Sequence, residues 1–164
     1  MKKIYLVRHA KSSQAGEGES DFDRGLNERA YTDIPIMAKV MKKRNIKPEL
    51  IISSDAKRTI HTTKLLIKEL GLDAVKTKYS NKLYLTSVAE YIKKIRKTDS
   101  EYNELMIVGH NPTITDLANE LTGSFIDNMP TTGIVTILFK DNSWKAVGTI
   151  KGKMAHFDFP KKFK

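Results

Sequence analysis

Short apolar runs alternate with longer amphipathic stretches from one end of the chain to the other. Runs of about four to eight mainly apolar residues, bounded by polar turn residues, are typical of buried strands. Strands are therefore predicted over residues 3–7, 48–54, 74–78, 104–108, 135–139 and 144–150. The last two alternate apolar and polar residues around Asp141 and Asn142, a pattern that indicates a hairpin.

Between these strands, apolar side chains recur at the spacing of an α-helix. The first predicted helix begins near residues 26–28 and runs to residue 44, and Pro35 marks either its start or a bend. Asp55 is the expected N-cap of the second helix, which ends at Gly71, and Ser87 is the expected N-cap of the third. The fourth helix covers residues 113–121 and ends near Gly123.

Strands that alternate with helices predict an α/β fold, a three-layer α/β/α sandwich with a mainly parallel central sheet. Residues 11–25 hold little apolar material and are expected to form a long loop. No repeat and no domain linker interrupts the 164 residues, so residues 1–164 are predicted to form a single domain.

The amino-acid composition limits the kinds of functional site that the chain can form. The chain has no cysteine, which excludes disulfides, thiolate metal sites and a cysteine nucleophile. Hydrophobic residues are 40% of the chain, and no apolar run approaches the ~20 residues that span a bilayer, so no membrane partner is expected. A cytoplasmic location is expected.

The formal net charge is +10, which favours polyanionic partners. The lysines are nevertheless scattered, and we interpret them as solvated helix faces and chain ends; they are Lys2, Lys3, Lys42, Lys43, Lys93, Lys94, Lys161 and Lys162. No nucleic-acid partner is therefore expected. A positive field also suits a phosphorylated substrate.

Three predicted strands end in residues that carry chemistry. The first ends in Arg8 and His9, the second is followed by Arg58 just inside its helix, and the third is followed by His110. In parallel sheets ligands bind beyond the carboxyl ends of the strands, so these side chains are expected at one edge.

Two arginines and two histidines at one edge predict an anion site. Arginine binds a phosphoryl group through a planar fork of donors. A neutral imidazole can attack phosphorus, and flanking positive charge keeps its pKa low enough for it to stay unprotonated. Backbone N–H groups of the turn after His9 are expected to add donors. The sequence therefore predicts phosphoryl chemistry here.

Five segments in order resemble the histidine phosphatase superfamily, and within it the SixA-type phosphohistidine phosphatases. They are "LVRHAKS" at 6–12, "DFDRGLN" at 21–27, "ISSDAKRTIHT" at 52–62, "VGHNP" at 108–112 and "MPTTG" at 129–133. The resemblance covers nearly the whole chain. The sequence departs from the family pattern at Ala10, Gln14, Ala30 and Asp55, positions that concern loop shape and substrate fit and remove no catalytic group.

The resemblance implies a phosphoglycerate mutase-like fold and a phosphatase that needs no cofactor. It implies that His9 is the phosphorylated nucleophile and that Arg8, Arg58 and His110 hold the phosphoryl group. Arg24, in the loop before the first helix, is implied to face the same pocket and bind substrate.

Relatives that hydrolyse alkyl phosphates usually carry a Glu or Asp as general acid after the second strand and helix. Here residues 81–87 contain no carboxylate, and Glu90 lies inside a predicted helix. Phosphohistidine relaxes this demand because its leaving group is an imidazole with a conjugate acid of pKa roughly 6.5. The substrate is therefore expected to be phosphohistidine on a partner protein, with inorganic phosphate as product, although Asp21 or Asp23 could supply an acid from the loop.

Other interpretations remain at this stage. A metal site on His9, His61 and His110 is disfavoured because the arginines would repel a cation, and His156 is interpreted as a surface residue. The alternatives are a phosphatase for small phosphoesters and a non-catalytic module that binds phosphate or nucleic acid. The sequence leaves the oligomeric state open.

Overall fold

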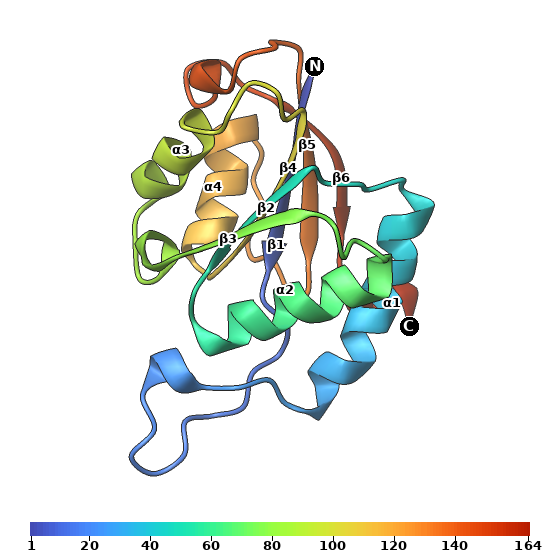
Figure 1. The fold of residues 1–164 in the computed structure, drawn as a ribbon, viewed down its shortest axis with the longest axis vertical. Helices are drawn as coiled ribbons and strands as arrows, with labels where there is room; N and C mark the ends of the chain where they lie inside the picture. Colours follow the sequence, from blue (N-terminus) through green and yellow to red (C-terminus); the bar gives the residue numbers. More distant parts are fainter.

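The computed structural model describes residues 1–164 and contains one six-stranded sheet in the order β3-β2-β4-β1-β5-β6 (Figure 1). The strands are β1 (Lys2–Arg8), β2 (Leu50–Ser54), β3 (Lys76–Ser80), β4 (Glu104–Gly109), β5 (Ile134–Phe139) and β6 (Lys153–Asp158). The first four are mutually parallel, whereas β5 pairs antiparallel with both β1 and β6. The predicted α/β fold with a mainly parallel sheet is confirmed.

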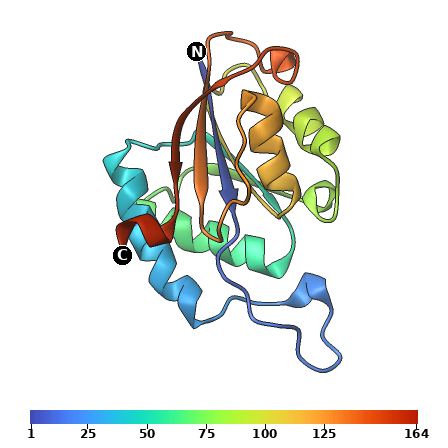
Figure 2. The same cartoon turned by 180° about the vertical axis from the view of Figure 1, so that it is seen from behind.

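Four α-helices cover the sheet: α1 (Glu28–Lys43), α2 (Lys57–Leu70), α3 (Val88–Arg96) and α4 (Thr113–Thr122). Figures 1 and 2 show α1 and α2 on one side of the sheet and α3 and α4 on the other. Short 3-10 turns occur at Asp21–Asp23, Asn81–Leu83, Trp144–Ala146 and Pro160–Phe163. None of the helices combines the length and the apolar character that crossing a membrane requires.

The two-residue period of β1 explains why both faces of the sheet are covered. Ile4 and Leu6 belong to the core beneath α3 and α4, whereas Tyr5 and Val7 belong to the core beneath α1 and α2. Side chains alternate between the two faces of a strand, so a run that is apolar at every position must be covered on both sides.

Most predicted helix ends agree with the structure. The side chain of Ser87 accepts a hydrogen bond from the backbone N–H of Glu90, and α2 ends at Gly71, whose φ of 67° is left-handed. Asp55 is not the N-cap of α2, because that position belongs to Ala56, which makes no side-chain cap. Pro35 neither starts nor ends α1 but lies inside it.

The predicted antiparallel pairing of β5 is present, but the partner strand lies at other residues than predicted. The strand that pairs with β5 is β6, at 153–158, and not residues 144–150. Residues 144–146 instead form a 3-10 turn that buries Trp144, whose indole N–H donates to the carbonyl of Tyr102 at 2.8 Å. Burial of this large ring outweighs the local alternation of apolar and polar residues.

Lys2 does not lie on a solvated surface, as its place in the sequence suggested. It is 2% exposed, and its ammonium donates to the carbonyls of Ser100 and Tyr102 at 2.7 Å each. It also donates to the side chain of Asn103 and lies over the ring of Trp144. Buried ammonium groups require such partners because desolvation of a charge is costly.

Gly109, the last residue of β4, marks a close approach between the sheet and α3. A Cβ atom at this position would overlap the hydroxyl and ring of Tyr91. Tyr91 is fully buried, and its hydroxyl donates to the carbonyl of Leu83 at 3.0 Å. Only glycine therefore lets the backbone that leads to His110 pass this ring.

Gly109→Ala is expected to lower the free energy of unfolding by about 1–3 kcal/mol, because a buried side chain must move to make room. Urea unfolding followed by circular dichroism measures this. Gly16→Ala is the matched control, since a Cβ there meets nothing within 4 Å and should change stability by less than ~0.5 kcal/mol. Equal stability of Gly109→Ala and the native protein would contradict the packing described here.

Candidate active site

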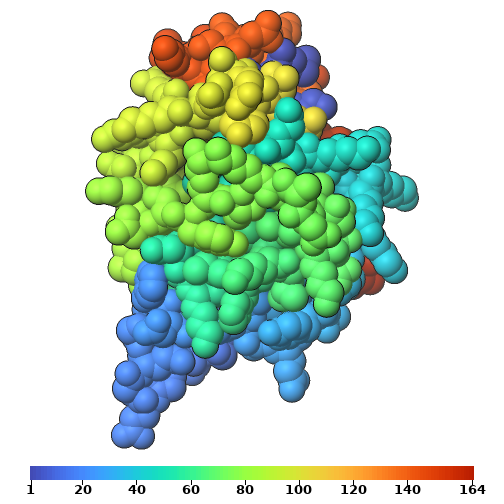
Figure 3. Space-filling view, viewed as in Figure 1, coloured from blue at the N-terminus to red at the C-terminus, as the bar shows by residue number.

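A pocket of about 790 Å³ lies beyond the carboxyl ends of β1, β2 and β4, which are neighbours in the sheet. The residues that line it include all five that the sequence predicted: Arg8, His9, Arg24, Arg58 and His110. The 11–25 segment projects beside this end of the molecule (Figure 3) and contributes several more lining residues.

His9 follows β1 and is 6% exposed. Its Nδ1 lies 2.8 Å from the carbonyl oxygen of Ala10, which can only accept a hydrogen bond. Nδ1 therefore carries the ring hydrogen, and Nε2 keeps its lone pair. The pKa of His9 is lowered to about 3, chiefly by burial and to a smaller extent by His110, Arg58 and Arg8, while the hydrogen bond to Ala10 acts in the opposite direction. The imidazole is thus neutral at physiological pH, chiefly because it is buried and only secondarily because cations lie near it.

Two backbone N–H groups at this turn, those of His9 and Ala10, are used within the protein. The N–H of His9 donates to the carbonyl of Gly109 at 3.1 Å. The N–H of Ala10 donates to Oγ1 of Thr62 at 2.9 Å. These bonds hold the turn against β4 and α2.

Two arginines approach His9 from different elements. Arg8, the last residue of β1, donates from Nη1 to the carbonyl of Met129 at 2.8 Å. Arg58, in the first turn of α2, is 4% exposed and donates from Nη1 to the carbonyl of Asp21 at 2.7 Å. The Nε atoms of both arginines are buried and have no hydrogen-bond partner in the protein. Unpaired guanidinium donors of this kind suit a bound oxyanion.

The carboxylate of Asp21 connects the other polar groups of the pocket. It accepts hydrogen bonds from Nε of Arg24 at 2.9 Å, from Nη2 of Arg58 at 3.1 Å and from the Tyr84 hydroxyl at 2.5 Å. Arg24 also donates to Oγ of Ser12 at 2.9 Å, which ties the two ends of the 11–25 segment together.

These contacts also decide the protonation state of Asp21. Its pKa is lowered to about 2, first by the hydrogen bond from Tyr84 and then by Arg58 and Arg24. The carboxyl is therefore ionised near neutral pH and cannot act as the general acid that the sequence left open. Asp23 does not line the pocket, and its carboxylate accepts a hydrogen bond from Ser20.

His110 follows β4 and faces Ser54, the last residue of β2, with 2.7 Å between Nε2 and Oγ. The backbone N–H of Ala56 donates to the same hydroxyl at 3.3 Å. Nδ1 of His110 is buried and has no hydrogen-bond partner in the protein. Burial and the nearby Arg58 lower the pKa of His110 to about 4, so this ring is neutral near neutral pH.

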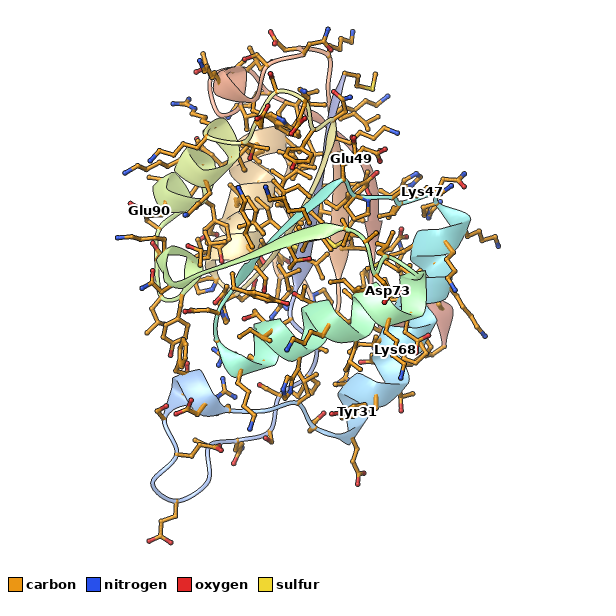
Figure 4. All side chains as sticks on the ribbon, viewed as in Figure 1. Tyr31, Lys47, Glu49, Lys68, Asp73 and Glu90 are labelled. Carbon is orange, nitrogen blue, oxygen red and sulfur yellow. The ribbon has the colours of Figure 1, made fainter.

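Segment 81–87, where the sequence lacked an acid, forms part of the pocket wall. The ring of Tyr84 meets His110 edge-on with centroids 5.5 Å apart, and Leu85 lines the pocket. The sequence missed both residues because no period or motif distinguishes them. Glu90 lies on α3 at the periphery of the molecule (Figure 4) and does not line the pocket.

The two remaining histidines lie elsewhere. His61 is on α2 and does not line the pocket. His156 is in the edge strand β6, where it is half-buried and keeps part of its surface exposed. No group of three or more His, Asp and Glu side chains is arranged as a metal-binding cluster.

The two lowered histidine pKa values predict how stability changes with pH. Unfolded histidine has a pKa of about 6.5, so between about pH 6.5 and 4 the unfolded chain binds more protons at His9 and His110 than the folded protein does. Stability therefore falls as pH decreases through this window, by up to about 1.4 kcal/mol per pH unit for each group.

His9→Gln removes one of these groups and is expected to make the fall in stability shallower. Urea unfolding at several pH values between about 4.5 and 7.5 tests this. Gly16→Ala is the control, because it removes no titratable group, and its pH dependence should match that of the native protein. An unchanged slope for His9→Gln would show that His9 is not buried in its neutral form.

Comparison with known proteins agrees with this geometry. The sequence model described as "Histidine phosphatase superfamily (branch 1)" matches residues 4–81. An uncharacterised protein of Mycobacterium leprae is 27% identical over 167 residues, which cover 94% of this chain and all of that protein. An uncharacterised chloroplastic protein of Arabidopsis thaliana is 26% identical over 159 residues, which cover 92% of this chain and 72% of that protein.

Solved structures extend the likeness to the whole fold. SixA from Agrobacterium tumefaciens has a TM-score of 0.84 and 28% sequence identity, and the match covers 97% of this chain and 98% of that one. A protein histidine phosphatase SixA solved with tungstate has a TM-score of 0.83 at 19% identity and covers 99% of both chains, a likeness of fold. Residues 4–81 thus match the histidine phosphatase superfamily, and the whole chain has a fold similar to that of the SixA proteins.

Proposed function

We propose that this histidine phosphatase superfamily phosphatase removes the phosphoryl group from phosphohistidine on a partner protein. Nε2 of His9 attacks phosphorus, and the bond between phosphorus and the substrate imidazole breaks. With its second ring nitrogen protonated, the substrate side chain departs as neutral imidazole. Water then attacks the phosphoryl group on His9, which releases inorganic phosphate and restores the free imidazole.

The observation that carries the proposal is the state of His9. A nucleophilic imidazole needs one ring nitrogen fixed and the other free, and the bond from Nδ1 to the Ala10 carbonyl supplies this arrangement. Burial keeps the ring unprotonated. The neighbouring Arg58 and His110 line the same pocket, as donors for the oxygens of a transferring phosphoryl group.

The charge of the pocket supports the roles proposed for the arginines. Arg8, Arg24 and Arg58 line it, and Asp21 is its one acidic residue. The excess of positive charge fits a phosphoryl dianion and the additional charge that develops in the transition state. Arg24 binds substrate in this proposal, while Asp21 holds Arg24 and Arg58 in place.

The leaving group favours phosphohistidine over an alkyl phosphate. The one carboxylate that lines the pocket is ionised and accepts three hydrogen bonds, so it cannot protonate an alkoxide. Imidazole leaves without such help. Small phosphoesters are the second candidate substrate class, and the location of the protein in the cytoplasm stays a prediction from its sequence.

His9→Ala is expected to abolish release of phosphate from a histidine-phosphorylated carrier domain, with a loss of about 10³-fold or more. Phosphate release is measured with chelator present, for the native protein and the variant. His61→Ala is the matched control, because His61 lies outside the pocket, and it should keep near-native activity. A native protein that leaves the carrier domain phosphorylated would refute the phosphohistidine assignment.

Because the pocket lacks a usable general acid, the rate of hydrolysis should depend on how readily the leaving group departs. The native protein should hydrolyse a phosphohistidine protein and an aryl phosphate, but an alkyl phosphate slower by roughly 10²–10⁴-fold, the usual contribution of general acid catalysis. Steady-state kcat/KM for p-nitrophenyl phosphate and glycerol phosphate measures the contrast. Equal turnover of the two esters would show that another group donates the proton.

A further inference from the structure

Leu85 is the single apolar residue among those that line the pocket. Its side chain is 81% exposed, and its backbone has a φ of 47°, in the left-handed region that bulky side chains rarely adopt. An isolated exposed leucine is ordinary on a protein surface. An exposed leucine in a disfavoured conformation at the mouth of a polar pocket is not, since such outliers cluster at functional sites.

The segment around Leu85 is firmly held rather than loosely attached. On one side, the Tyr84 hydroxyl donates to Asp21, and the Tyr84 ring packs edge-on against Phe22, with centroids 5.0 Å apart. On the other side, the carbonyl of Thr86 accepts a hydrogen bond from Oγ1 of Thr113 at 2.9 Å. The backbone therefore presents the Leu85 side chain to solvent from a fixed position, as a preorganised binding contact requires.

Two lysines accompany Leu85: Lys11 lines the same pocket, and Lys82, three residues before Leu85, is exposed. A phosphoryl group that reaches His9 occupies only the floor of a pocket of about 790 Å³. Whatever carries that group must continue outward past Leu85.

We propose that Leu85 is the docking contact for the protein part of the substrate, and this inference rests on the proposed function. Its occupant is an apolar patch beside the phosphohistidine of the partner, within an acidic surface that complements Lys11 and Lys82. Small phosphorylated molecules enter the polar pocket without using Leu85. The side chain thus favours protein-borne phosphohistidine over free phosphoesters through binding and not through chemistry.

Leu85→Asn tests the inference without straining the fold, because asparagine tolerates the left-handed conformation better than leucine does. With a histidine-phosphorylated carrier domain as substrate, KM is expected to rise roughly tenfold with kcat nearly unchanged. With p-nitrophenyl phosphate, the loss in kcat/KM should be clearly smaller than the loss with the carrier domain. Leu85→Met, which keeps an apolar side chain, should restore most of the affinity for the carrier domain.

Phe125→Asn is the matched control. Phe125 is fully exposed, lies between α4 and β5 and does not line the pocket, so its replacement should change neither substrate. An unchanged KM for the carrier domain in Leu85→Asn would overturn the inference while leaving the proposed function intact. Equal losses on both substrates would also overturn it, because Leu85 would then shape the pocket itself. Failure of the native protein to act on the carrier domain would remove both proposals together.

Discussion

The hydrogen bond from Nδ1 of His9 to the carbonyl of Ala10 is the interaction on which the site depends. It fixes the tautomer of a ring that burial keeps neutral, so a lone pair is available on Nε2. The turn that provides this carbonyl is itself held by the N–H of Ala10 bonded to Thr62, and the N–H of His9 bonded to Gly109. The parallel strands β1 and β4 and the helix α2 thereby fix the positions of the two ring nitrogens of His9.

The electrostatic arrangement around His9 follows from a single carboxylate. The carboxylate of Asp21 accepts hydrogen bonds from Arg24, Arg58 and Tyr84. Its negative charge holds the two guanidinium groups close together despite their mutual repulsion. The same three contacts keep the carboxyl ionised. Asp21 thus holds two of the three arginines that line the pocket, and its ionised carboxyl is not a general acid.

The residues at the strand ends could be predicted because the chemistry and the topology coincide. Arg8, His9 and His110 each follow an apolar strand, and parallel strands bring their carboxyl ends to one edge. The positions of Leu85 at the pocket and of Tyr84 against His110 could not be predicted, since they depend on how a loop between β3 and α3 packs against distant residues.

Tertiary packing also accounts for the errors in the predicted elements. Burial of Trp144 displaces the second strand of the hairpin to β6, and buried partners turn Lys2 from a surface charge into part of the interior. The cap of α2 at Ala56 shows the same limit, because Asp55 has the usual side chain for an N-cap and is not used. Local sequence patterns give the conformational preference of a residue, but tertiary packing determines the conformation that it adopts.

The central claim is that His9 carries the phosphoryl group during turnover. Rapid mixing with a histidine-phosphorylated carrier domain, alkaline quenching and mass spectrometry of the intact protein and its peptides test this directly. The account predicts a transient, acid-labile phosphoryl group, at most one per chain, on the peptide that contains His9. It predicts none in His9→Ala. Phosphate release at the native rate with no phosphorylated protein at any time, or with the group on another residue, would contradict it.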